Sequence, residues 1–438
     1  MGAVAQAQYP GSMLRLLIAG FVTAASLCAA EVHTLTMRQA IELALKQSPE
    51  VVLARLDEQR ARQQVRIAKD PFTPKVYGGS GLAYTNGYPT SIEGSAPSIF
   101  EARTSMSLFN RQQSYQLAST RESLRGASLD AQAKSDDVAY KTATLFLDAK
   151  QATRTRGSVE REIASLERVS EAIRTRVSEG REIPLEAKRA DFNLASARQR
   201  ALVAAANQEY AEGSLALVLG YPVGDRVRAA DDDSGQLTIP ESEQATVQQA
   251  LQNSREIKRL QAQLQSRMLD VRGYKSARLP VVDLVAQYSL LAKHNYVQFF
   301  NKFQRNNTEL GVSVTLPLLV GSAAGGYLSQ AEIDISKMRA QVAEAEKRIS
   351  VDAAKGYQDV KLAESGRDVA KMDLDLTRDN VTVLLAQQDE GRVSQAQVDQ
   401  ARMVEQEKWI AYYDAVNTIE KAKLSLLRET GSILAALR

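Results

Sequence analysis

The sequence predicts a mainly helical fold made of two copies of one plan, each with two β-strands and a long helical hairpin. The second half repeats the first at an offset of about 206 residues, which places Ala250 on Ala44. Two long tracts, from Ser98 to Ile183 and after Pro317, contain no proline that would break a helix. Four short segments alternate apolar with polar residues, as half-buried strands do.

Composition excludes several classes of function. The 438 residues carry 55 Lys+Arg and 52 Asp+Glu, and a net charge of +3 gives no basic surface for nucleic acid. The 2 histidines, His33 and His294, have no zinc-binding spacing, and 1 cysteine cannot complete a thiolate site. We therefore expect no metal, no cofactor and no nucleic-acid partner.

Residues 1–30 are expected to be an upstream segment followed by a secretory signal peptide. Arg15 supplies the positive region, the stretch to Leu27 is mostly apolar, and small residues up to Ala30 suit cleavage. The start codon is either Met1 or Met13. Cys28 either leaves with the signal or becomes an acylated N-terminus, but the bulky residue before it disfavours acylation.

The repeat divides the rest of the chain. We expect a first repeat at 31–223, a linker at 224–240 and a second repeat at 241–438. The linker contains three consecutive aspartates and several glycines, which is typical of a solvated connection.

The first repeat is expected to begin with a helix that Thr36 caps together with Gln39. This helix should restart at Ser48-Pro49, because the residue before a proline avoids helical geometry. Strands at about 76–85 and 100–109 and a helical hairpin at 112–219 follow.

The second repeat is expected to have the same order. Ser242 caps a helix that should run from about Glu243 to Ala277. Strands at about 282–291 and 308–316 and a helical hairpin at 322–436 follow. The long helices of the two hairpins should end at Gly180 and Gly391, where glycine allows a left-handed cap.

Four strands cannot close into a barrel alone, because both edges of the sheet would expose unpaired backbone groups. A tilted strand of about ten residues rises about 25 Å, the height of the apolar band of an outer-membrane barrel. Three copies would supply twelve strands, an even number that such barrels use. The alternative is a small soluble sheet that caps a helical bundle.

The order of these elements resembles the TolC-type outer-membrane efflux proteins over nearly the whole mature chain. Five segments carry the resemblance. Ala44 to Glu50 resembles a helix followed by Asn-Pro-Glu, Leu279 to Leu284 a strand entry, and Val312 to Gly321 a strand exit into a long helix. Glu179-Gly180-Arg181 and Glu390-Gly391-Arg392 resemble the hairpin tips.

The resemblance implies a homotrimer in the outer membrane of a Gram-negative bacterium, with a large periplasmic portion. Its strands would form a twelve-stranded barrel in outer-membrane lipid, and its helices an α-barrel tunnel. Solutes would leave passively from an inner-membrane transporter through a periplasmic adaptor. By the same resemblance the adaptor would dock on the hairpin tips, Gly180, Arg181, Glu182, Ile183, Gly391, Arg392, Val393 and Ser394. Drugs, metals, small metabolites and secreted polypeptides all remain open as cargo.

The expected periplasmic constriction departs from the family pattern, which often has a ring of acidic residues after the second tip. The matching positions here are Gln397 and Gln400, with Asp399 between them and Glu186 in the first repeat. Asp399 lies about 100° around the helix from Gln400, so the sequence does not predict the usual cation-binding ring.

No catalytic constellation is found. Gly78-Gly79-Ser80-Gly81 lacks the final glycine of a nucleophile elbow and any following lysine, and it falls in a predicted strand. We therefore expect no enzyme. Two functions remain: a passive trimeric export channel, or an exported periplasmic helical scaffold without a pore.

Overall fold

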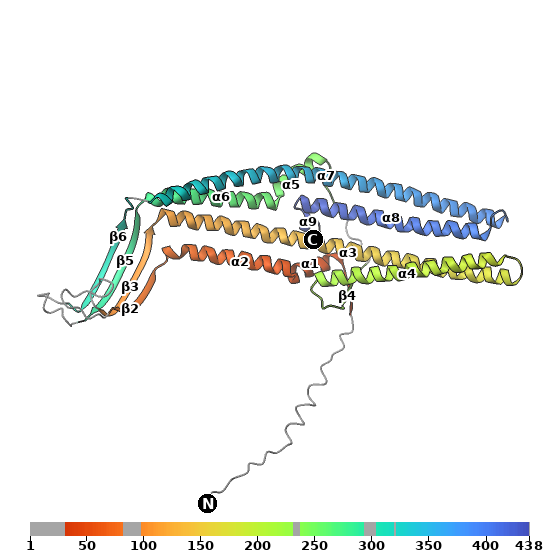
Figure 1. The fold of residues 1–438 in the computed structure, drawn as a ribbon, viewed down its shortest axis with the longest axis horizontal. Coiled ribbons are helices and arrows are strands. Elements are labelled where there is room, and N and C mark those ends of the chain that lie inside the picture. The colour runs from red at the N-terminus through yellow and green to blue at the C-terminus, as the bar shows by residue number, and fades with distance from the viewer. Residues whose placement is uncertain (1–30, 82–97, 231–236, 293–303, 319–320, 438) are drawn as a thin grey trace, which may run out of the picture. The chain divides into compact units, whose positions relative to one another are not determined.

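The computed structural model describes residues 31–81, 98–230, 237–292, 304–318 and 321–437 (Figure 1). The chain divides into two compact units, and each draws on both repeats. Unit 1 comprises Met1–Ala40, Leu145–Ser234 and Leu374–Tyr413; unit 2 comprises Ile41–Thr144, Gly235–Asp373 and Asp414–Arg438. The expected signal peptide lies outside the described residues.

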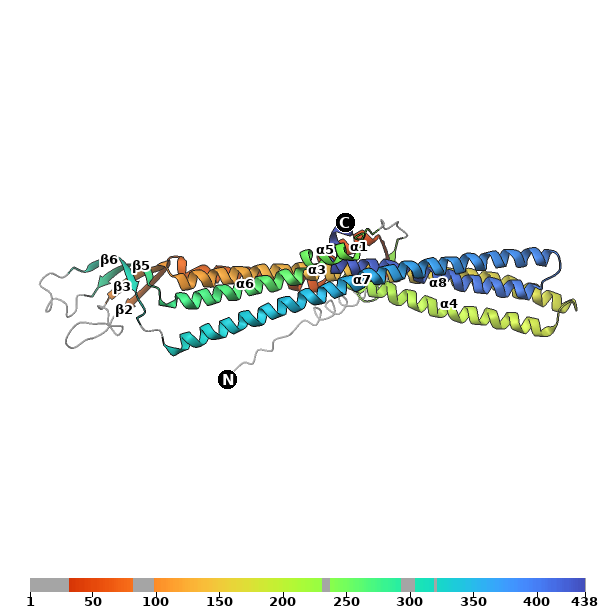
Figure 2. The same cartoon turned by 90° about the horizontal axis from the view of Figure 1, so that it is seen from above.

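The helices of the two repeats match in length. The first has α1 Met37–Gln47, α2 Pro49–Lys69, α3 Arg111–Ser178 and α4 Pro184–Val218; the second has α5 Glu243–Asn253, α6 Arg255–Lys275, α7 Ser322–Asp389 and α8 Gln395–Glu429, with the short α9 Ile433–Ala436 at the end. The pairs have 11, 21, 68 and 35 residues respectively. Figure 2 shows both long helices turning back into hairpins. The mainly helical fold is confirmed.

The helix starts follow the predicted caps, with one correction. Thr36 and Gln39 form the expected reciprocal pair, with N···O distances of 3.0 and 3.3 Å, and Ser48-Pro49 separates α1 from α2. The expected continuous helix from Glu243 to Ala277 is wrong, because it breaks at Ser254. The Ser254 hydroxyl there accepts a bond of 3.2 Å from the Ile257 amide and caps α6.

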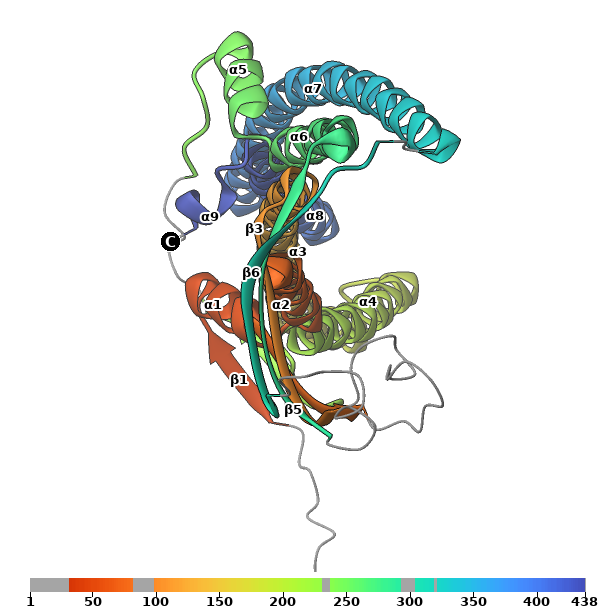
Figure 3. The same cartoon turned by 90° about the vertical axis from the view of Figure 1, so that its left-hand side faces the viewer.

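Four strands form one antiparallel sheet in unit 2, in the order β2-β3-β5-β6. They are β2 Lys75–Gly81, β3 Ser98–Phe109, β5 Val281–Leu291 and β6 Asn306–Thr315, and Figure 3 shows them as one curved layer. At most of the strand ends, the expected bounds differ from the observed ones by one or two residues. Residues 82–85 of the expected first strand lie outside the described residues. β2 and β6 are the edge strands.

One face of this sheet is apolar and the other is polar. Val312 of β6 pairs with Leu284 of β5, which also pairs with Met106 of β3. The next pairs along the same strands, Ser313 with Asp283 and Asp283 with Ser107, point to the opposite face. On that polar face the Ser107 hydroxyl donates to Asp283 Oδ1 over 2.5 Å. The alternation predicted from the sequence is therefore present.

Unit 1 contains a second, two-stranded sheet that the sequence did not indicate. β1 Val32–Leu35 pairs in parallel with β4 Arg226–Ala229, inside the segment expected to be the linker at 224–240. Val227 is completely buried there. Strands of four residues are too short for alternation to distinguish them from a loop. The three consecutive aspartates of the expected linker lie outside the described residues.

The helices pack through small and branched apolar side chains. In unit 2, Ala250 and Ile257 pack on Ile349 and Ala353, and in unit 1, Leu166 packs on Leu194 and Ala197. Alanine lets helices approach closely, which explains the high alanine content. Within the described ranges, no helix combines the length and apolar character needed to cross a membrane.

Candidate functional site

The two hairpin tips in unit 1 have the same backbone geometry. Gly180 has a φ of 69° and Gly391 a φ of 74°, the left-handed region that favours glycine. At the first tip Gly180 N donates to Val177 O (3.0 Å) and Arg181 N to Arg176 O (2.8 Å). At the second tip Gly391 N donates to Gln388 O (2.8 Å) and Arg392 N to Gln387 O (2.9 Å). Both tips are Schellman caps, as the glycines predict.

The side chains of the tips form local pairs and remain accessible. Arg181 pairs with Glu179 at 3.2 Å and Arg392 with Glu390 at 3.1 Å, both largely exposed. Such pairs contribute little to stability. Ile183 precedes α4 and is 56% exposed, although it is apolar. The tips therefore present solvated arginines and one exposed isoleucine.

Gln397, one of the four expected constriction residues, caps a helix. Its side-chain oxygen accepts bonds from the backbone amide of Ser394 at 3.0 Å and from the Ser394 hydroxyl at 3.1 Å. This is the returning half of a capping box at the start of α8. The sequence pattern of serine followed three residues later by glutamine could have indicated this role.

The other three expected constriction residues, Glu186, Asp399 and Gln400, line one pocket of about 520 Å³ between the two hairpins of unit 1. Glu186 forms an ion pair of 2.6 Å with Arg189, which lines the same pocket and was not predicted. The sequence therefore identified three residues that the fold brings together.

Asp399 is 9% exposed, so its side chain is buried rather than directed into water. Its Oδ1 accepts a bond of 2.8 Å from Gln395, while Oδ2 has no partner among the described residues. Burial raises the pKa of the Asp399 carboxyl, against the opposing influence of Gln395, Arg402 and Arg176. In the described part of the chain, no group of three or more His, Cys, Asp or Glu residues could hold a metal ion.

Midway along the hairpins of unit 1, aromatic rings and arginines form a stack across three helices. Trp409 and Tyr413 of α8 stack with centroids 5.6 Å apart. Arg378 of α7 lies 5.7 Å from the Trp409 centroid, and Arg154 of α3 lies 5.8 Å from the Tyr413 centroid. The alternation of cation and ring links α7, α8 and α3.

Replacing Trp409 with alanine is expected to lower the free energy of unfolding by about 2 kcal/mol, because a half-buried ring and its cation contact are lost. Trp409→Phe keeps a ring and should cost about half as much. Urea unfolding followed by circular dichroism measures both. An unchanged free energy of unfolding in Trp409→Ala would show that the ring contacts contribute nothing.

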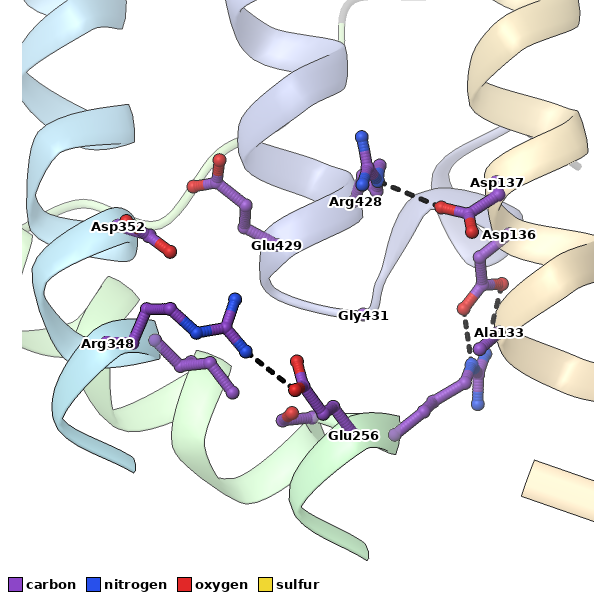
Figure 4. Close-up of a pocket in the computed structure, with 12 residues that line it drawn as sticks. Ala133, Asp136, Asp137, Glu256, Arg348, Asp352, Arg428, Glu429 and Gly431 are labelled. Carbon is purple, nitrogen blue, oxygen red and sulfur yellow. Dashed lines mark hydrogen bonds and ion pairs between the residues drawn. The ribbon is translucent and has the colours of Figure 1, made fainter. Parts of the chain in front are cut away.

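A charged pocket of about 330 Å³ lies in unit 2, where α3, α6, α7 and the end of α8 meet (Figure 4). Three of its carboxylates are paired. The pairs are Arg255 with Asp136, Arg348 with Glu256 at 2.6 Å, and Arg428 with Asp137 at 3.1 Å.

Glu429 also lines this pocket, and its buried Oε2 has no hydrogen-bond partner among the described residues. Its carboxylate lies against the backbone of Gly356, where an added Cβ would be 2.5 Å from that oxygen. Burial first, and then the negative charges of Asp352 and Asp359, raise the pKa of Glu429 to about 7 against the lowering influence of Arg428 and Lys355.

Stability is expected to fall as the pH rises through the range from about 4.5 to about 7, because the folded protein holds a proton on Glu429 that the unfolded chain has lost. Since the group is partly solvated, we expect the change to be about 1 to 2 kcal/mol. Glu429→Gln should remove this dependence and be more stable than the parent at pH 8. Urea unfolding at pH 5 and pH 8 tests this, and an unchanged slope in the variant would contradict it.

The comparisons with known proteins place the chain in a class of membrane channels. The family model described as outer membrane efflux protein matches residues 40–221 and 246–432. The chain therefore belongs to the outer membrane efflux protein family, as its resemblance to TolC-type proteins predicted. It is an outer-membrane efflux channel and not an enzyme, which favours the channel over the exported scaffold without a pore. No curated protein matches the chain.

Solved structures share the fold. A membrane protein from Pseudomonas aeruginosa is 15% identical, with 90% of each chain covered and a TM-score of 0.73. The outer membrane protein VceC from Vibrio cholerae is 14% identical, with 90% of this chain and 96% of that chain covered and a TM-score of 0.71. The CmeC outer membrane channel of Campylobacter jejuni is 14% identical, with 91% and 86% covered and a TM-score of 0.70. At such identities the similarity concerns the fold.

Proposed function

We propose that three copies of this chain form one channel-tunnel, in which the strands close as a twelve-stranded barrel. The sheet carries this proposal, because β2 and β6 leave both edges open. Its apolar face is also exposed among the described residues: Leu310 is 78% exposed, Val312 57% and Val314 65%. A barrel in lipid resolves both problems at once, since it has no edges and directs its apolar face outward.

The helices support assembly in the same way. Exposed apolar side chains lie along α4, among them Leu202 at 73% and Tyr210 at 79%, and along α7, among them Ile333 at 65% and Leu362 at 71%. Apolar surface repeated along long helices is typical of an interface. Neighbouring copies would cover it and enclose the tunnel.

We propose that solutes leave through this tunnel passively, because no catalytic or nucleotide-binding constellation in the sequence could supply energy. An inner-membrane transporter would deliver the solutes through a periplasmic adaptor. The adaptor would dock on the two tips, Gly180 to Ile183 and Gly391 to Ser394, because their matching caps present two equivalent surfaces. Glu186, Asp399 and Gln400 would lie at the constriction beside them.

The repeats at 31–223 and 241–438, joined by 224–240, are proposed to derive from one duplicated unit. The family model matches two separate segments of the chain, and the four helices of one repeat have the lengths of their counterparts in the other. Both observations support the duplication.

Membrane fractionation with chemical crosslinking tests the assembly. The protein should require detergent for extraction and should crosslink to a species of three chains. A soluble periplasmic monomer would contradict the channel-tunnel.

Docking is tested by a single cysteine at the tip. The sequence has 1 cysteine, Cys28, in the expected signal peptide, so new thiols can be placed selectively once Cys28 is replaced. Ser394→Cys should crosslink in cells to a periplasmic adaptor. Thr382→Cys, at an exposed position about two turns before the end of α7, should not. Equal crosslinking of both positions would contradict docking at the tip.

A further inference from the structure

A second, smaller pocket of about 180 Å³ lies between α3 and α8 in unit 1, and three arginines line it. Arg168 and Arg176 come from the end of α3 and Arg402 from the second turn of α8. Ser165 and Gln395 add a hydroxyl and an amide. No carboxylate-bearing residue of the described chain lines this pocket. Its polar lining therefore consists of two neutral groups and three guanidinium groups.

Within the described chain, the lack of a carboxylate partner distinguishes these arginines from others near the tips. Those others pair with carboxylates, at N···O distances from 2.6 to 3.2 Å: Arg174 with Asp191, Arg181 with Glu179, Arg189 with Glu186, Arg198 with Glu167 and Arg392 with Glu390. In the described chain, neither Arg176 nor Arg402 has a carboxylate oxygen within 4.0 Å. Arg168 donates its Nε to the carbonyl of Ala164 at 3.2 Å.

Asp399 is the acidic group whose charge acts on two of these arginines, Arg402 and Arg176. It lines the larger neighbouring pocket rather than this one. One of its oxygens accepts a bond from Gln395, and burial disfavours its charged form. One buried carboxylate therefore cannot balance three guanidinium groups, and the small pocket keeps a net positive charge.

We propose that this pocket binds a small oxyanion, a phosphate or a carboxylate, between α3 and α8. Guanidinium groups hold carboxylates and phosphates through paired N–H···O bonds, which are among the stronger hydrogen bonds in proteins. The arginines are exposed, so they can reorient around an anion. An anion in this position relieves the repulsion among three like charges, and it links the first hairpin to the second close to the tips.

Titration calorimetry on the purified full-length protein in detergent tests this proposal, with inorganic phosphate and citrate as probes at constant ionic strength. We expect both probes to bind, and Arg176→Gln and Arg402→Gln each to weaken the affinity about tenfold or more. Arg392→Gln, which removes a tip arginine outside the pocket, is the matched control and should leave the affinity unchanged. Asp399→Asn should strengthen binding, because it removes the opposing charge.

The result that would overturn the proposal is binding that Arg176→Gln and Arg402→Gln weaken no more than Arg392→Gln does, or no binding at all. If no probe binds and Arg402→Gln instead loosens the oligomer, an acidic side chain of a second copy fills the pocket and the small-anion proposal is wrong. These measurements use purified protein, so they do not depend on the proposed partners or cargo.

Discussion

Replacing Val312 with lysine is expected to remove most of the assembled protein from the outer membrane. Val312 is 57% exposed on the apolar face of β6, which in the proposed barrel faces lipid. A lysine at the middle of the bilayer costs about 2 to 4 kcal/mol in each copy. Each trimer contains three such lysines, so the summed cost is comparable to the whole free energy of unfolding of a typical protein. We therefore expect the assembled trimer to be lost.

Ser313→Lys is the matched control, because the adjacent residue has the same backbone setting and the opposite face. It pairs with Asp283 on β5, so a lysine there gains an acidic neighbour. The amount of trimer that resists detergent without heating, measured on gels of membrane fractions, compares the two variants. If Ser313→Lys were the more damaging variant, the proposed orientation of the sheet would be reversed.

Replacing Arg255 with methionine is expected to lower the free energy of unfolding by about 3 to 5 kcal/mol, because it leaves Asp136 without its partner. Asp136 is only 5% exposed. Both its oxygens accept bonds from Arg255, one of them from Nη2 at 3.1 Å. The pair joins α6 to α3 inside unit 2, so its loss leaves a buried charge between two packed helices.

Arg259→Met provides the comparison from the next turn of α6. Arg259 pairs with Asp130 at 3.2 Å, but the Asp130 side chain is 54% exposed, so we expect a loss below about 1 kcal/mol. Adding Asp136→Asn to Arg255→Met should restore part of the stability, since the uncompensated charge disappears. Urea unfolding gives all three values, and similar losses for the two arginine variants would contradict the importance of burial.

Local signals predicted much of the fold. Glycines at 180 and 391 and the absence of proline define the hairpins, because these residues act on the backbone whatever surrounds them. The break at Ser254 was missed because Arg255 occupies the position that Pro49 has in the first repeat. A serine alone is a weak sign of a helix start, and the bond from the Ile257 amide that makes Ser254 a cap depends on the folded backbone.

The candidate site was harder to predict, since burial depends on which helices meet. The sequence located Glu186, Asp399 and Gln400 near the tips, but not the burial of Asp399 or the two unpaired arginines beside it. Arg176 and Arg402 are 226 positions apart in the chain (402 minus 176), and no local pattern connects them. Only the packing of α3 on α8 brings their charges together.

The most direct test of the central claim is the electrical conductance of the purified, detergent-extracted protein in a planar lipid bilayer. If three chains close a water-filled barrel and tunnel, the current should rise in discrete, uniform steps as single trimers insert. Protein that demonstrably enters the bilayer as a trimer yet never produces such steps would contradict the channel-tunnel.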